Sequence, residues 1–212
     1  WHACRKSTHE TFAIKAISKT GDTHYQHIER VVVERDILAS MNSPFVVQMY
    51  WAFQDTSHVY FVLEHAQGGD LCSVMHIFHP HGMSEDHARF YIAEVLLALE
   101  YLHAMDIHVR DVKPANCLTT AAGHILLADF GHSKWLGDNN LQSGNEPTGG
   151  EPSHGDDCCV GTPEYMAPET LHQQVEAGKM ADYWSVGIIL YELMHAHLPW
   201  GSSHDTGVEG LF

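Results

Sequence analysis

The first regular pattern in the chain is an alternation of apolar and polar positions from Phe12 to Ile17. An alternation with a period of two predicts a β-strand. Apolar runs predict two further strands, over Pro44 to Tyr50 and over His58 to Leu63. Three shorter apolar runs in the middle of the chain predict strands as well, over Ile107 to Val109, Asn116 to Thr119 and Ile125 to Ala128.

Three longer segments have apolar residues at helical spacing. His24 to Met41 carries a stripe with a spacing near 3.6 residues. Ser84 to Met105 begins at a good N-cap residue and has acids in its first turn, which predicts a regular helix that is buried as a central pillar. Asp182 to His195 is apolar all round, so we expect it to be largely buried and to end by Pro199. The positions that define these faces are Ile28, Val31, Val32, Arg35, Leu38 and Met41, then Ile92, Val95, Leu96, Leu99 and Leu102, then Trp184, Gly187, Ile188, Leu190, Tyr191 and Met194.

One segment, Gly137 to Asp157, has no periodicity and is rich in Gly, Asn, Ser, Pro and acids. This composition predicts an extended and mostly disordered connection. Its length is unusual for a passive link within a compact domain, so we expect it to have a role of its own.

The composition is that of a soluble globular chain, with 44% apolar and 18% charged residues among 212. The formal net charge is -16, from 27 acids and 11 bases, which argues against nucleic acid or an anionic membrane as the main partner. No apolar run reaches membrane-spanning length, and the first residues do not form a signal peptide. Basic or neutral polypeptides remain as candidate partners.

The cysteine and histidine patterns do not indicate a disulfide framework or a metal centre. An odd number of irregularly spaced cysteines favours a reducing compartment, the cytoplasm or the nucleus. His76 and His79 share a helix face, but no Cys or acid completes a tetrahedral set and Pro80 interrupts the helix. The five cysteines are Cys4, Cys72, Cys117, Cys158 and Cys159.

The candidate chemistry lies in the segment Arg110-Asp111-Val112-Lys113-Pro114-Ala115-Asn116, which Asp129-Phe130-Gly131 follows thirteen residues after the Asn. Phosphoryl transfer to an alcohol needs a carboxylate to accept the hydroxyl proton and a cation to hold the γ-phosphate. It also needs two oxygen ligands for Mg²⁺. Strand-loop-strand packing would bring the two acids of these segments together.

A lone lysine on a strand is usually an exposed charge, and Lys15 by itself would be no more than that. Its position gains meaning because acids follow on the next predicted helix. By spacing alone, either Glu29 or Glu34 could reach it.

These motifs, followed by Gly161-Thr162-Pro163-Glu164-Tyr165 and Ala167-Pro168-Glu169, stand in the order found in protein kinases. The chain resembles that family from Phe12 to about Trp200. The resemblance implies an α+β, bilobal protein-kinase fold, with a small antiparallel β-sheet lobe and a mainly helical large lobe. It implies a partial small lobe over residues 1–63, a hinge over 64–70, and a partial large lobe over 71–212 with an extended activation segment over 129–169.

The resemblance also implies roles for the catalytic set. Asp111 accepts the hydroxyl proton, and Lys113 steadies the γ-phosphate. Asn116 and Asp129 hold Mg²⁺. Lys15 binds the α- and β-phosphates of ATP.

The resemblance also implies that Glu34 orients Lys15, because the segment Glu34-Arg35-Asp36-Ile37-Leu38 looks like the corresponding helix of the AGC group of kinases. Thr162 ties the substrate loop to Asp111, and Asp182 braces the catalytic loop from a helix.

An adenine site is implied as well. The backbones of Glu64 and Ala66 hydrogen-bond the base, with Ala13 above it and Leu118 beneath it. Asp70 has two readings, an acceptor from the ribose hydroxyls or the N-cap of the next helix.

Four segments look like the branch of microtubule-associated serine/threonine kinases and their Greatwall and plant relatives: Ser43-Pro44-Phe45-Val46-Val47, Gly68-Gly69-Asp70, Leu97 to His103 and Gly123-His124-Ile125. The implied function is transfer of the γ-phosphate of ATP to Ser/Thr hydroxyls of protein substrates in intracellular signalling. The alternative is a pseudokinase or scaffold that binds nucleotide or partners without turnover.

The sequence departs from the family pattern in ways that affect activity and regulation. Val109 stands where the family has His before the Arg-Asp pair. The Gly-rich loop and the end of the large lobe are missing, so we expect a fragment that is truncated at both ends and weakly active or inactive as it stands.

Cys158 stands at the usual activation-loop phosphosite. Arg110 would then pair with Asp156 or Asp157, or with a phosphate on Ser143, Thr148 or Ser153. The upstream regulator is unknown.

Overall fold

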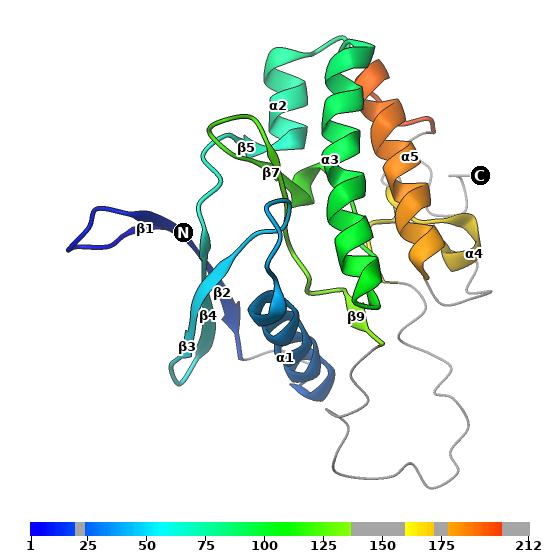
Figure 1. Cartoon of the computed structure of the whole chain (residues 1–212). Helices are drawn as coiled ribbons and strands as arrows, with labels where there is room; N and C mark the ends of the chain where they lie inside the picture. Colours follow the sequence, from blue (N-terminus) through cyan, green and yellow to red (C-terminus); the bar gives the residue numbers. More distant parts are fainter. Residues whose placement is uncertain (20–23, 137–159, 172–177, 201–212) are drawn as a thin grey trace, which may run out of the picture.

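The structure is a computed structural model that describes residues 1–19, 24–136, 160–171 and 178–200, with the backbone alone for 24–27 (Figure 1). The expected loose segment, 137–157, falls outside the described residues. Cys158 and the alternative partners expected for Arg110 fall outside them too.

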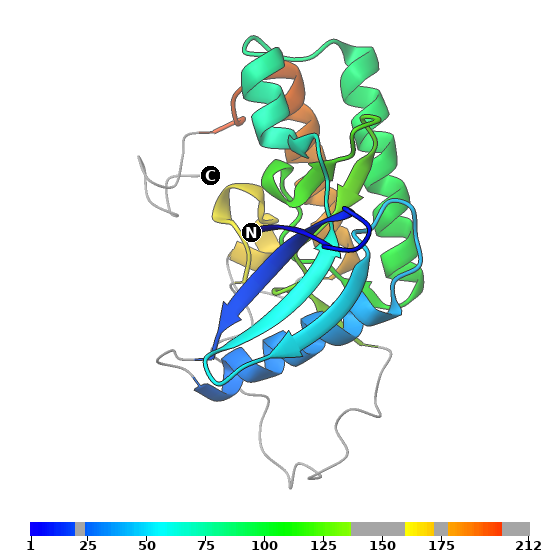
Figure 2. The same ribbon diagram turned by 90° about the vertical axis from the view of Figure 1, so that its left-hand side faces the viewer.

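A four-stranded antiparallel sheet forms the first part of the chain. Its strands are β1 (His2–Cys4), β2 (Thr11–Ser18), β3 (Met49–Gln54) and β4 (His58–Glu64), in the spatial order β1-β2-β4-β3. Helix α1 (His24–Ser40) runs across one face of this sheet (Figure 2). The predictions for β2, β4 and α1 are confirmed to within a few residues.

The strand expected over Pro44 to Tyr50 is wrong in its position, because β3 begins at Met49. The residues before it form a turn and a buried connection that is hydrogen-bonded to Leu127. The amide of Val47 donates to Leu127 O (3.0 Å), and the amide of Leu127 donates to Phe45 O (2.8 Å). The apolar run therefore reflects burial of a loop and not a ladder of the sheet.

The buried face of α1 also differs from the expected stripe. Ile28 is 47% exposed and Val32 is 36% exposed, since both line an open cavity between the helix and the sheet. The carboxylate-bearing Glu34 is buried in their place. The buried positions of this helix are Glu34, Ile37 and Leu38, and Met41 follows directly after its end.

The second part of the molecule is mainly helical. Helix α3 (Glu85–Ala104) lies beside α2 (Leu71–Phe78) and α5 (Lys179–His195), and the short α4 (Pro168–Leu171) sits near the base of α5 (Figure 1). The expected N-cap is confirmed, since Ser84 Oγ accepts from the amide of His87 (3.4 Å). Together with the sheet part, this arrangement confirms the α+β fold class.

Two burial expectations for these helices are wrong. Leu96 of α3 is exposed, and α5 is not buried all round, because its Trp184, Leu190 and Met194 face outward among the described residues. The buried side of α5 carries a polar stripe as well as an apolar one. Its members are Ala181, Asp182, Ser185, Val186, Ile188, Ile189, Glu192 and Leu193.

Short strands and single turns carry the candidate chemistry between these helices. They are β5 (Gly69–Asp70), β6 (Ile107–His108), the 3₁₀ turn Pro114–Asn116, β7 (Cys117–Thr119), β8 (Ile125–Leu127), β9 (Lys134–Trp135) and the 3₁₀ turn Pro163–Tyr165. Among them, β6, β7 and β8 agree in position with the three short strands expected from the sequence.

One hydrophobic cluster joins both parts of the molecule. It runs from Ile37 of α1 through Val46 and Phe130 to Leu99 of α3 and Leu193 of α5. The loop that bears Asp-Phe-Gly is therefore packed between the sheet part and the helical part. In the described part of the chain, no helix is both long enough and apolar enough to cross a bilayer.

Candidate active site

The backbone of the loop after β6 is hydrogen-bonded to one buried carboxylate. Asp182, which is 1% exposed, accepts from the amide of Val109 (Oδ2, 3.0 Å) and from the amide of Arg110 (Oδ1, 2.8 Å). The Nε2 atom of the buried His103 lies 2.7 Å from the same Oδ2. Arg110 has φ 69, a conformation that costs energy for a residue with a side chain. Asp182 thus occupies the bracing position expected from the sequence, and it fixes the backbone immediately before Asp111.

Val109, which replaces the family's His, is fully buried in the same cluster as Phe130. Its carbonyl accepts from Ser133 Oγ (3.2 Å). The valine therefore supplies packing at this position, and its backbone links the loop to the segment after Asp-Phe-Gly.

Asp111 carries a carboxylate with donors on both oxygens. Thr162 Oγ donates to Oδ1 (2.7 Å), while Lys113 Nζ (2.9 Å) and Asn116 Nδ2 (3.2 Å) bind Oδ2. A fourth group, His132 Nδ1, lies 3.6 Å from Oδ2. Burial alone would raise the pKa of Asp111, but His132, Lys113 and Thr162 outweigh it and hold the pKa well below its ordinary value. The carboxylate is therefore ionised at neutral pH.

Lys113 also contacts Thr162, with Nζ 2.7 Å from Oγ1. The three side chains of Asp111, Lys113 and Thr162 therefore form a closed triangle. It ties the loop after β6 to the segment at 160–165, as expected for Thr162 from the resemblance to protein kinases.

The second cluster connects the sheet part to the Asp-Phe-Gly loop. Lys15 Nζ of β2 lies 2.6 Å from Glu34 Oε1 and 2.8 Å from Asp129 Oδ1. Of the two acids left open by spacing, the structure pairs Glu34 with Lys15, while Glu29 is exposed. Burial raises the pKa of Glu34, and Lys15 offsets this only in part.

Burial would lower the pKa of Lys15, but the two acids outweigh it and raise that pKa above its ordinary value. Burial would similarly raise the pKa of Asp129, and Lys15 outweighs it, so the pKa of Asp129 is lowered. Lys15 is therefore a fixed positive charge between Glu34 and Asp129, placed to meet an anion.

Asn116 and Asp129 are the residues that would hold a metal ion. Asn116 Nδ2 donates to the carbonyl (2.8 Å) and the carboxylate of Asp111, so its amide oxygen is the atom that would bind. A Cβ at Gly131 would lie 3.3 Å from Asp129 Oδ1, so the glycine keeps the space beside that oxygen clear. A carboxylate and an amide oxygen are ligands that Mg²⁺ accepts, so the residues fit this ion.

The expected adenine-site residues lie where the sheet part joins the helical part. Ala13 of β2 is half-buried, as are Ala66 and Leu118 of β7. The amide of Glu64 donates to Gln48 O (2.8 Å), so a base could meet Glu64 only through its carbonyl.

Asp70 is the N-cap of α2. Its Oδ1 accepts from the amide of Ser73 (2.8 Å), and its Oδ2 accepts from Ser73 Oγ (2.8 Å). The capping alternative is thereby confirmed, and contact with a ribose stays a prediction.

Sequence reasoning missed the proximity of His132 to Asp111 and that of His103 to Asp182. The first had a local signal, because His132 directly follows Asp-Phe-Gly. The second had none, since His103 and Asp182 are separated by 79 residues. In the described parts of the chain, no group of three His, Cys, Asp or Glu side chains is arranged to hold a metal, and His76 Nδ1 lies 2.8 Å from Cys72 O.

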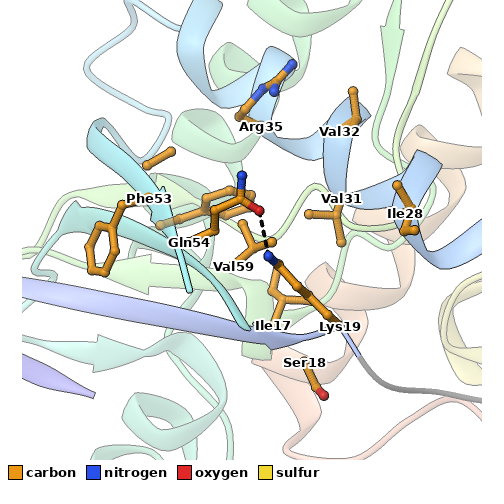
Figure 3. A pocket seen from close by; sticks show the side chains of 12 residues that line it. Ile17, Ser18, Lys19, Ile28, Val31, Val32, Arg35, Phe53, Gln54 and Val59 are labelled. Carbon is orange, nitrogen blue, oxygen red and sulfur yellow. Dashed lines mark hydrogen bonds between the residues drawn. The ribbon is translucent and has the colours of Figure 1, made fainter. Parts of the chain in front are cut away.

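A cavity of about 450 Å³ lies elsewhere, between α1 and the sheet (Figure 3). Its walls include Ile28, Val31, Val32 and Arg35, which are four of the six positions of the stripe expected for this helix. Lys19 reaches across one end to Gln54 Oε1 (2.6 Å). None of the residues that line it belongs to the clusters around Asp111 and Asp129, so it is separate from the candidate site.

Comparison with known families matches residues 1–210 to the protein kinase domain. The chain is 40% identical over 210 residues to "Probable serine/threonine protein kinase IRE" of Arabidopsis thaliana, covering 91% of this chain and 18% of that protein. It is 38% identical over 190 residues to the "RAC family serine/threonine-protein kinase homolog" of Dictyostelium discoideum (90% and 39%). It is 39% identical over 197 residues to human "Rho-associated protein kinase 1" (92% and 13%). The chain thus spans well under half the length of each of these relatives.

Proposed function

This chain belongs to the protein kinase domain family, and from that premise we propose that the protein carrying it transfers the γ-phosphate of ATP to Ser/Thr hydroxyls of protein substrates. One observation carries the proposal: the ionised Asp111 carboxylate is bound by Lys113 and Thr162 at one site. The Lys15–Glu34–Asp129 arrangement lies close by, on the Asp-Phe-Gly side. These are a proton acceptor, a phosphate-binding cation and a metal ligand, held in one structure.

In the proposed reaction, the new O–P bond forms as the bond between the γ-phosphorus and the bridging oxygen breaks and ADP leaves; Asp111 orients the acceptor hydroxyl and takes its proton. A carboxylate with a lowered pKa is a weak base, so its main contribution is orientation, and the proton moves late. Lys113 Nζ, which already bridges Asp111 and Thr162, is placed to neutralise the transferred phosphoryl group.

Lys15 would bind the α- and β-phosphates while Glu34 keeps its ammonium in place. Asn116 and Asp129 would hold Mg²⁺, which supplies charge neutralisation to the phosphates. In this structure Lys15 binds Asp129 Oδ1, so a metal ion would share that oxygen with Lys15 or bind Oδ2. The base would lie between Ala13 and Leu118, and contact the backbones of Glu64 and Ala66.

Within the family, we propose the branch of microtubule-associated serine/threonine kinases with its Greatwall and plant relatives. The segments Ser43 to Val47 and Leu97 to His103 support it, as does the similarity to a plant kinase of the IRE name. The long stretch between Asp-Phe-Gly and Gly161 supports it as well.

Two substitutions in the full-length protein test the proposed roles. Asp111→Asn should abolish phosphate transfer to a Ser/Thr peptide and leave ATP affinity largely intact, because Asp111 does not hold ATP. Asp129→Asn should weaken the binding of Mg²⁺-ATP as well, because a metal ligand loses its charge. The exposed Asp86→Asn serves as the matched control, with wild-type transfer and binding.

The readouts are radiolabel transfer and calorimetric titration of nucleotide with and without Mg²⁺. Equal Mg²⁺-ATP affinity in Asp111→Asn and Asp129→Asn would contradict the division of roles. Nucleotide binding without transfer by the wild type would instead favour a pseudokinase.

A further inference from the structure

The ring of His132 is the group near Asp111 that the proposed reaction leaves without a task. Its Nδ1 lies 3.6 Å from Asp111 Oδ2, slightly beyond hydrogen-bond length. The His132 side chain is 41% exposed, whereas that of Asp111 is 4% exposed. The ring therefore closes the solvent side of a buried carboxylate, and a movement of a few tenths of an ångström would make a hydrogen bond.

The backbone around His132 is anchored to the loop that bears Asp111. Ser133 Oγ donates to Val109 O (3.2 Å), and the amide of Ser133 donates to Phe130 O (3.0 Å). Phe130 itself is fully buried. The ring is therefore not a loose surface side chain, because the residues on both sides of it are fixed to the core and to the Asp111 loop.

One of the other two donors to Asp111 Oδ2 has a competing partner in the proposed reaction. Lys113 (2.9 Å) has to face the transferred phosphate, whereas Asn116 (3.2 Å) can keep its Nδ2 bond to Oδ2 while its amide oxygen meets the metal. Thr162 binds the other oxygen, Oδ1. When the phosphate of the nucleotide engages Lys113, Oδ2 loses its charged donor while the carboxylate still has to keep its orientation.

We propose that His132 is a positioning residue that holds Asp111 Oδ2 when nucleotide engages Lys113. The inference rests on the proposed function and adds to it a residue that acts through Asp111. An imidazole Nδ1–H donates one hydrogen bond, which fixes the rotation of the carboxylate without adding a second point charge.

Replacement of His132 by Leu and by Asn in the full-length protein tests this role. Leu fills the space without a donor, whereas Asn keeps an N–H near the position of Nδ1. The Leu variant should lose about tenfold in kcat, the lower end of what a hydrogen bond to a charged group contributes. The Asn variant should recover to within about threefold of the wild type, and the KM for ATP should stay within about twofold in both, because His132 has no contact with nucleotide in this scheme.

His81→Leu, at an exposed position between α2 and α3, is the control for replacement of a histidine as such. Wild-type kcat in His132→Leu would overturn the inference. Equal losses in the Leu and Asn variants of His132 would overturn it too, since they would indicate a packing role.

A structure of the wild type with Mg²⁺ and a non-hydrolysable ATP analogue tests the same inference without turnover. We expect the His132 Nδ1 to Asp111 Oδ2 distance to shorten to hydrogen-bond length as Lys113 leaves Oδ2. A ring turned away from Asp111 in that complex, or failure to bind the analogue, would overturn the inference. Absence of transfer by the wild type, with the shortened distance present, would refute the proposed function alone.

Discussion

Replacement of Asp182 by Asn tests how strongly one buried carboxylate holds the loop before Asp111. The two carboxylate oxygens of Asp182 together serve the amides of Val109 and Arg110 and the ring of His103. An amide side chain has one acceptor oxygen. If that oxygen takes the place of Oδ2, the new NH₂ group faces the amide of Arg110, and a buried donor loses its acceptor.

The structure sets the size of the effect. One buried N–H without an acceptor costs about 1–3 kcal/mol, and the two remaining bonds lose their charge assistance, for a total of about 2–4 kcal/mol. For a chain of this length, that loss lowers the melting temperature by roughly 5–15 °C. Since Arg110 has φ 69, its backbone should relax once the bond is lost, and the neighbouring Asp111 should be misplaced.

The assay is thermal and urea unfolding of the wild type, Asp182→Asn and the control Asp86→Asn, followed by kcat for phosphate transfer in the full-length protein. Asp86 is an exposed acid of the first turn of α3, paired with Arg89 at 2.9 Å, and its replacement should change stability by less than about 0.5 kcal/mol. A change of that small size in Asp182→Asn would refute the bracing argument, and so would a stability loss with unchanged kcat.

Three further predictions follow from the same geometry. Glu34→Gln should lower kcat/KM for ATP at least about tenfold, because Lys15 loses a charged partner at 2.6 Å, while the exposed Glu29→Gln should stay near wild type; similar losses in both would contradict the pairing. Burial raises the pKa of Cys117 to about 12, whereas Cys4 is exposed. In the folded protein, iodoacetamide should therefore modify Cys4 on the order of a hundred times faster than Cys117, and peptide mapping by mass spectrometry would measure the two rates. The pKa of Asp111 is lower in the folded chain than its unfolded value of about 3.9. Ionised Asp111 therefore stabilises the fold at pH values above about 3.9, and this stabilisation is lost as the pH falls towards the folded pKa. The wild type should thus lose stability relative to Asp111→Asn between about pH 5 and pH 2. A stability difference that does not change with pH would show that the pKa of Asp111 is the same in the folded and unfolded chain.

The local patterns that the sequence carries were sufficient for the elements whose signal is local. Alternation predicted β2, and the N-cap at Ser84 predicted the start of α3. The spacing of Asp111, Lys113 and Asn116 placed three functional groups in one loop, since a few residues of chain cannot separate them widely. The α+β class followed from the resemblance to protein kinases.

The faces that are buried were decided by tertiary packing. Ile28 and Val32 match the helical stripe but line a cavity, while the acidic Glu34 is buried because Lys15 lies opposite it. Val46 belongs to an apolar run that looks like a strand, yet it is buried as a loop against β8.

The geometry of the site depends on contacts between residues far apart in the chain. Arg110 has a left-handed backbone, and its amide donates to Asp182, which lies 72 residues later in the chain. Lys15 meets Asp129 across 114 residues, and His132 reaches Asp111 from a different loop. Periodicity and spacing report what a residue can do within one element, whereas burial, ion pairing and strain depend on which other element the fold brings against it.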